Sequence, residues 1–221
     1  MNSSGGRFVT LLAFAFLSGC AHPRLPVVQG PIEGMDQNYV PMVPGKEWTY
    51  HARVDGSDGA DDIRVGWRIV SVRATPQGTE FTWEIQPDGR PAERQIWLAT
   101  NKGLYETADG IEKTVFFEPP QPIFEYPLRA GNTFQWSGNG LLPNGKPGYS
   151  NLNGKVDAVE NVTTPSGTVG AIPVEYSMTG SGIDTSIKVW FTPGIGVVQI
   201  SEIDKFDKKT DRSDCILENV Q

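Results

Sequence analysis

Polar and apolar residues alternate with a period of two along most of the chain from about residue 38 onward. Branched and aromatic residues hold one phase, and mostly charged or small residues hold the other, in the segments 47–54, 62–69, 80–85, 174–179 and 186–191. This alternation is typical of half-buried antiparallel strands. Turn sequences rich in Gly, Pro, Asp and Asn separate the segments, and we find no helical stripe of useful length. We therefore predict an all-β domain.

Three short motifs occur twice in the same order, about ninety residues apart, as expected of a duplicated unit. The duplication predicts two similar units, residues 38–125 and 126–208, within one β domain at 38–208. Together they give an antiparallel meander of about eleven strands. We expect a curved sheet, a half-barrel or a sandwich, because an open sheet of that size tends to curl or split. The three pairs of markers are Gly45 and Gly131, the segments 75–79 and 164–168, and Trp97 and Trp190.

Two stretches lack the alternation. Residues 138–154 are rich in Gly, Asn and Pro, which predicts a long surface loop. Residues 209–221 are charged, and we expect them to form a polar C-terminal tail.

Trp97 and Trp190 stand on the opposite phase from their aliphatic neighbours. A strand that is apolar on both faces is usually covered on both sides. One interpretation is plain packing between layers. The other is that both tryptophans line a site for an apolar ligand.

The first 19 residues have the features of a secretory signal. Arg7 precedes an apolar run at 8–17, which is too short to span a bilayer, and small residues precede Cys20. We predict a signal peptide at residues 1–19. A flexible, Pro- and Gly-rich tether follows at residues 20–37.

Leu17-Ser18-Gly19-Cys20 resembles the lipobox of bacterial lipoproteins. The resemblance implies that Cys20 becomes the first residue of the mature protein and carries lipid, such as palmitate, on its sulfur and amine. Acyl chains would then hold the protein on a membrane. Ala21 is not the Asp that is usually linked to inner-membrane retention. The resemblance therefore implies the periplasmic face of the outer membrane. An ordinary secretory signal with a chance cysteine is the alternative.

Composition limits the possible chemistry. The net charge of −7 disfavours nucleic acid as a partner. The two histidines, His22 and His51, are not spaced with carboxylates as a zinc site or a Ser-His-Asp triad requires. We predict no catalytic residues, no metal and no cofactor. With Cys20 acylated, Cys215 is left as an unpaired thiol, an intermolecular disulfide partner or a reactive group.

The last hundred residues resemble a family of uncharacterised bacterial secreted proteins and lipoproteins, which brings no known activity. An antiparallel sheet behind a lipobox is also similar in outline to the half-barrel of lipoprotein-sorting proteins, although this chain lacks their helical lids. We predict a non-enzymatic, lipid-anchored envelope protein that binds a partner or has a structural role. The alternative is a carrier or sensor of an apolar ligand. The family resemblance rests on Tyr126-Pro127-Leu128 with Gly131 and Trp136, on 164–168 and on 190–198.

Overall fold

The computed structural model describes residues 39–56, 59–111, 113–142, 146–180, 183–206 and 209–221. These ranges form thirteen strands, and all paired strands run antiparallel. The strands are β1 (Glu47–Gly56), β2 (Gly59–Thr75), β3 (Gly78–Pro87), β4 (Glu93–Ala99), β5 (Gly103–Gly110), β6 (Val115–Glu125), β7 (Thr133–Leu141), β8 (Pro147–Val156), β9 (Glu160–Thr164), β10 (Gly167–Gly180), β11 (Ile183–Thr192), β12 (Gly196–Phe206) and β13 (Lys209–Val220).

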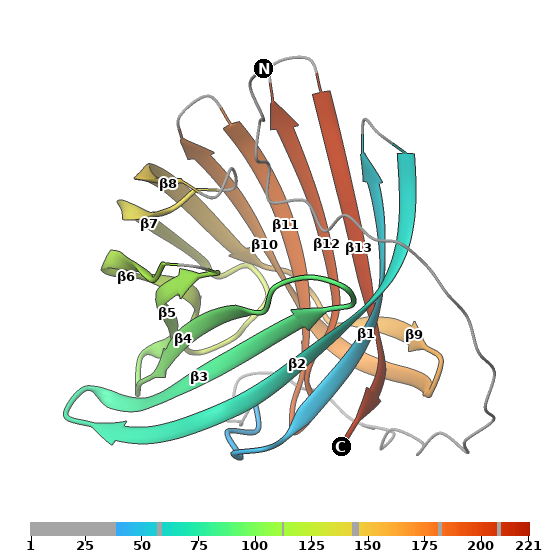
Figure 1. The fold of residues 1–221 in the computed structure, drawn as a ribbon. Helices are drawn as coiled ribbons and strands as arrows, with labels where there is room; N and C mark the ends of the chain where they lie inside the picture. The colour runs from blue at the N-terminus through green and yellow to red at the C-terminus, as the bar shows by residue number, and fades with distance from the viewer. Residues whose placement is uncertain (1–38, 57–58, 112, 143–145, 181–182, 207–208) are drawn as a thin grey trace.

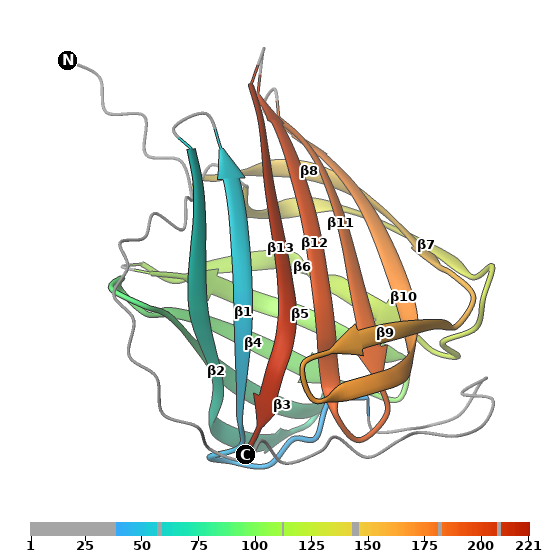
Figure 2. The ribbon, with the colours of Figure 1, turned by 90° about the vertical axis from the view of Figure 1, so that its right-hand side faces the viewer.

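Twelve of the described strands close into a barrel (Figure 1). β13 pairs with β1, so the last strand of the chain lies beside the first. β10 pairs with both β8 and β11 and thereby completes the ring. β9 pairs with the first part of β10, and this hairpin lies across the outside of β12 and β13 (Figure 2). The Ser166 hydroxyl in the hairpin turn donates to the Glu218 carbonyl of β13 at 2.7 Å.

The structure confirms an all-β antiparallel meander and corrects its shape. The predicted curved sheet, half-barrel or sandwich of about eleven strands is a closed barrel, and the described residues hold thirteen strands. One reason is that residues 209–221 are not a polar tail, because they contain β13. Charged residues such as the exposed Arg212 make this stretch look polar, although Leu217 is fully buried on its inner face. The pairing of β13 with β1 is what closes the barrel.

The predicted loop at 138–154 is also wrong, because most of it belongs to the β7–β8 hairpin. Gly140 and Gly154 face the barrel interior, where aromatic rings pack directly on the backbone. A Cβ at Gly140 would lie 2.2 Å from Phe117 Cδ1, and one at Gly154 would lie 2.1 Å from Phe134 Cζ. Glycine is needed here for close packing and does not mark a loop.

The turns before β1 and β7 have the same hydrogen bonds. The Gly45 amide donates to the Ile69 carbonyl, and the Ile69 amide donates back to the carbonyl of the residue after Gly45. Gly131 and Val156 repeat this arrangement. Both glycines have the positive φ that glycine adopts readily, 83° and 89°.

The second pair of markers also repeats in structure. Thr75 Oγ1 donates to the Gly78 carbonyl at 3.0 Å, and Thr164 Oγ1 donates to the Gly167 carbonyl at the same distance. When the first unit is matched to the second in this way, the long strand β2 corresponds to β8 and β9 together. These matches support two similar units, while the unit boundaries stay a prediction.

No helix in the described part of the chain is long and apolar enough to cross a membrane. The predicted signal peptide (1–19), the tether (20–37) and the lipidation site Cys20 lie outside the described residues.

Candidate functional site: the barrel interior and an outer groove

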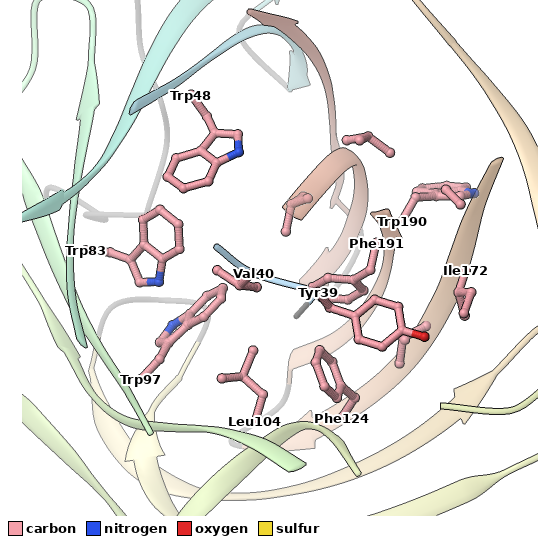
Figure 3. Packing of buried hydrophobic residues seen from close by; sticks show 14 of the residues in the cluster. Tyr39, Val40, Trp48, Trp83, Trp97, Leu104, Phe124, Ile172, Trp190 and Phe191 are labelled. Carbon is pink, nitrogen blue, oxygen red and sulfur yellow. The ribbon is translucent and has the colours of Figure 1, made fainter. Parts of the chain in front are cut away.

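One wall of the barrel interior is built from tryptophans on consecutive strands. Alternation along β1 to β4 places Trp48, Trp67, Trp83 and Trp97 toward the same space. Figure 3 shows three of them, Trp48, Trp83 and Trp97. Their rings touch at mostly steep angles, with centroids 5.0 Å apart for Trp48 and Trp83 and 5.3 Å apart for Trp83 and Trp97. Such tilted contacts are favourable for aromatic rings.

The opposite wall carries Phe124 on β6 and Phe191 on β11, whose centroids lie 5.1 Å apart. Two residues from before β1 lie in the space between the walls. Tyr39 is 1% exposed and Val40 is 4% exposed, and both are drawn inside the barrel in Figure 3. The Tyr39 ring meets Phe124 edge-on at 5.8 Å. Barrels with more than about eight strands are wider than their own wall side chains can fill, so this segment completes the core.

Buried polar atoms tie the walls together. Trp48 Nε1 donates to the Ile195 carbonyl at 2.6 Å, and the Tyr50 hydroxyl donates to the Val197 carbonyl at 2.9 Å. Both bonds connect β1 to the turn between β11 and β12 or to the start of β12. Burial raises the pKa of Tyr50 well above its usual value, so this hydroxyl remains a donor at any physiological pH.

The junction between β6 and β7 is the weakest part of the barrel wall. The described residues give a single ladder pair there, Glu118 with Asn139. The preceding and following pairs of strands have long ladders. β6 contains Pro119, Pro120 and Pro122, which have no amide hydrogen to donate. A normal ladder therefore cannot form along this part of β6.

Two side chains bond to β6 where the ladder is missing. Trp136 Nε1 donates to the Pro119 carbonyl at 2.9 Å, and the Tyr176 hydroxyl donates to the Ile123 carbonyl. Burial, followed by the nearby charge of Glu106, raises the pKa of Tyr176. The phenol therefore stays protonated and keeps its donor.

A groove of about 570 Å³ runs over the outer face of β7, β8, β10, β11 and β12. Its centre is the directly opposed pair Ser177 and Ser186. Most of its lining residues carry a hydroxyl, amide or charged group, although apolar atoms make up a large part of the lining surface. The groove adjoins the β9–β10 hairpin through Lys188 and Glu160. The outward-facing lining residues are Thr133, Gln135, Asn153, Lys155, Glu175, Ser177, Ser186, Lys188, Ser201 and Ile203.

Charge pairs fix the end of this groove. Lys188 Nζ lies 2.8 Å from Glu160 of the hairpin and 3.3 Å from Glu175. Lys155 lies 2.5 Å from Asp157, and this hydrogen bond lowers the pKa of the Asp157 carboxyl. Lys188 thereby links β11 to β10 and to the start of β9 at the surface.

The structure places the two candidate ligand-lining tryptophans on opposite sides of the barrel wall. Trp97 is 5% exposed and packs against the inward rings of Trp67, Phe81 and Trp83. Trp190 is 8% exposed, in phase with the outward Lys188, whose ammonium lies 5.0 Å from its ring centroid. Its neighbour Phe191 is the residue that points inward. The two tryptophans occupy corresponding strands, β4 and β11, but do not share one site.

Two other candidate residues, His51 and Cys215, stand elsewhere on the barrel wall. His51 Nε2 is 3.2 Å from Asp62 in an exposed pair on β1 and β2. Cys215 is half-buried and in phase with the inward Leu217, and burial raises its pKa to about 12. A thiol with that pKa is almost entirely protonated at neutral pH, which argues against a reactive cysteine.

Sequence reasoning missed Tyr39, Val40, Trp136 and Tyr176. Tyr39 and Val40 stand at the boundary of the predicted tether and have no strand periodicity. The run of prolines in β6 is the signal that could have identified the weak junction, since proline removes ladder donors.

Comparisons with known proteins give one partial family match and several similar solved structures. Residues 144–214 match the model of a family described as DUF3108-like. No curated protein matches the chain. Three similar solved structures are the "putative lipoprotein" of Parabacteroides distasonis, the "putative exported protein with YmcC-like fold" of Bacteroides fragilis and the "hypothetical lipoprotein YmcC" of Escherichia coli.

The first of these structures has a TM-score of 0.51 at 14% identity and covers 83% of this chain and 98% of its own. The second has a TM-score of 0.46 at 14% identity, with coverages of 82% and 97%. The third has a TM-score of 0.40 at 13% identity, with coverages of 80% and 89%. The Parabacteroides structure shows that this chain shares its fold with that protein over most of the length of both chains.

Proposed function

We propose that the protein is a lipid-anchored, non-enzymatic component of the cell envelope that binds a partner through the outer groove. The observation that carries this proposal is the filled barrel interior. Aromatic side chains from the wall, together with Tyr39 and Val40, already occupy the core. A concave surface that is open to a partner in this state lies on the outside, over β7, β8, β10, β11 and β12.

The proposed location rests on Cys20 and the lipobox. Lipid at Cys20 and the tether at 20–37 would place the barrel next to the membrane, and Ala21 favours the periplasmic face of the outer membrane. Two of the similar structures are named as lipoproteins and the third as an exported protein, which fits an envelope location.

The groove lining offers hydrogen-bonding groups to a polypeptide partner. Serine hydroxyls and the amides of Gln135 and Asn153 can donate and accept hydrogen bonds along an extended backbone. Gln135 and Asn153 are already hydrogen-bonded to each other at 3.1 Å, so their orientation is fixed before binding. Fixed polar groups reduce the ordering cost of association.

Site-specific photo-cross-linking in the native host tests this proposal. A photoreactive residue at Ser177 or Ser186 should give a cross-linked product of one discrete mass. The matched control is the opposed pair Ser71 and Thr82, which is hydrogen-bonded on the outer face of β2 and β3. Products of the same mass from both pairs, or no product from the groove pair, would show that the groove is not the binding surface.

A further inference from the structure

Tyr39 and Val40 occupy the barrel as a separate piece of chain. They precede β1 and belong to no strand, yet they are almost fully buried. The first backbone hydrogen bond between their segment and the barrel wall in the described chain is from Gly45 to Ile69. Val43 bonds within the segment itself, to Pro41. Ring packing, such as the edge-on contact of Tyr39 with Phe124, therefore contributes to holding this insertion.

Aromatic and aliphatic side chains surround the two residues. In Figure 3 Tyr39 and Val40 lie in the space between Trp48, Trp83 and Trp97 on one side and Phe124 and Phe191 on the other. Aromatic and aliphatic linings of this kind are typical of small-molecule sites. A barrel of twelve strands leaves interior volume that something other than its wall must fill.

One polar group in this lining has no partner. Trp83 is 3% exposed, and its Nε1 has no hydrogen-bond acceptor among the described residues. The ring lies against the edges or faces of Trp48 and Trp97. Buried polar groups normally find a partner, and exceptions point to function or to a missing molecule. A ligand with one hydrogen-bond acceptor would satisfy this indole.

We propose that the barrel interior is a binding site for an apolar chain bearing a carbonyl or carboxyl oxygen, and that Tyr39 and Val40 occupy it in the absence of ligand. Ligand entry displaces the segment from the barrel. This site is distinct from the outer groove and does not depend on it. Because the segment continues toward the tether, ligand binding frees additional length between the barrel and residue 20.

The test measures displacement directly, with lauric acid as the probe below its micelle concentration. The variant Val40→Cys is made together with Cys215→Ser. Because Cys20 is acylated in the lipoprotein, the new cysteine at position 40 is then the thiol that the reagent can label. Lauric acid should increase the rate of thiol labelling at residue 40 at least tenfold. The control is Val65→Cys, an inward wall residue that is 6% exposed, and its labelling should not change.

Tyr39→Ala and Tyr39→Phe give a second measurement. Tyr39 and Val40 compete with the ligand for the barrel interior, and removing the Tyr39 ring weakens this competition. Tyr39→Ala should therefore bind lauric acid several-fold more tightly than the wild type. Tyr39→Phe keeps the ring and should bind like the wild type. Faster labelling at both cysteines would mean that the acid unfolds the barrel, and would overturn the proposal. Lauric acid binding that leaves residue 40 protected, or no binding to Tyr39→Ala, would also overturn it. Loss of the groove cross-links would not affect it.

Discussion

Replacing Trp97 with alanine should remove a central part of the tryptophan wall. The ring is 5% exposed and lies 5.3 Å from Trp83, 5.8 Å from Phe81 and 6.4 Å from Trp67 between centroids. Truncating a buried large aromatic costs about 3–5 kcal/mol. The lost hydrogen bond from Nε1 to Gln95 Oε1, now 3.1 Å, adds about 1 kcal/mol or less because it is only partly buried.

This loss is large relative to the stability of a typical domain, which is about 5–15 kcal/mol in total. With a urea m-value of about 2–3 kcal/mol/M, the unfolding midpoint should fall by about 1–2 M. The assay is urea unfolding without ligand, followed by circular dichroism. Trp97→Phe is the matched control, because it keeps a ring in the cluster and should lose much less.

Trp190→Ala should also destabilise the fold, because Trp190 is 8% exposed on the outer side of the wall. A midpoint close to the wild-type value for Trp97→Ala, measured with an unchanged m-value, would refute the packing argument. The ring would then line a space that the fold does not need to fill. If Trp190→Ala also kept its midpoint, both tryptophans would again become candidates for ligand lining.

Three other predictions address packing, anchoring and the free thiol. Gly154→Ala would bring a Cβ to 2.1 Å from the Phe134 ring, and this overpacking should lower the free energy of unfolding by about 1–3 kcal/mol. The control is Gly66→Ala, whose Cβ would meet its nearest atom at 3.6 Å and which should leave the thermal midpoint almost unchanged. Cys20→Ser should leave an unprocessed or soluble precursor, and wild-type membrane fractionation of this variant would contradict the lipoprotein assignment. Cys215, with its pKa raised to about 12, should react slowly with thiol reagents at pH 8 in the folded protein and rapidly in concentrated urea; fast labelling of the folded chain would show that the thiol is accessible.

Local pattern was enough to predict the strands whose two faces differ. In β1 and β3 buried residues alternate with more exposed ones, and the sequence shows the same period. The turns at Gly45 and Gly131 were visible because each needs a positive φ, which glycine provides at little cost. These features depend on residues close together in the chain.

The errors came from contacts between distant segments. Glycine at position 154 resembles a loop residue until the Phe134 ring is seen to need its space. The charged C-terminal stretch resembles a tail until its pairing with β1 buries Leu217. Tyr39 and Val40 are buried because the closed barrel is wide, and strand periodicity carries no information about barrel closure. The candidate site was therefore predicted only in part, through Trp97.

The two junctions between the predicted units differ in a way that bears on how the barrel could open. At β13 and β1 the ladder runs from Trp48 to Asp55, and opening it would break many backbone hydrogen bonds together. At β6 and β7 the prolines of β6 leave one ladder pair, and the donors of Trp136 and Tyr176 supply two of the bonds that close this part of the wall. Side chains can change rotamer without unfolding a strand, whereas a ladder separates cooperatively. Any exchange of Tyr39 and Val40 with a ligand needs a route to the interior, and among the described strands the β6–β7 junction is the one that opens with the fewest backbone bonds lost.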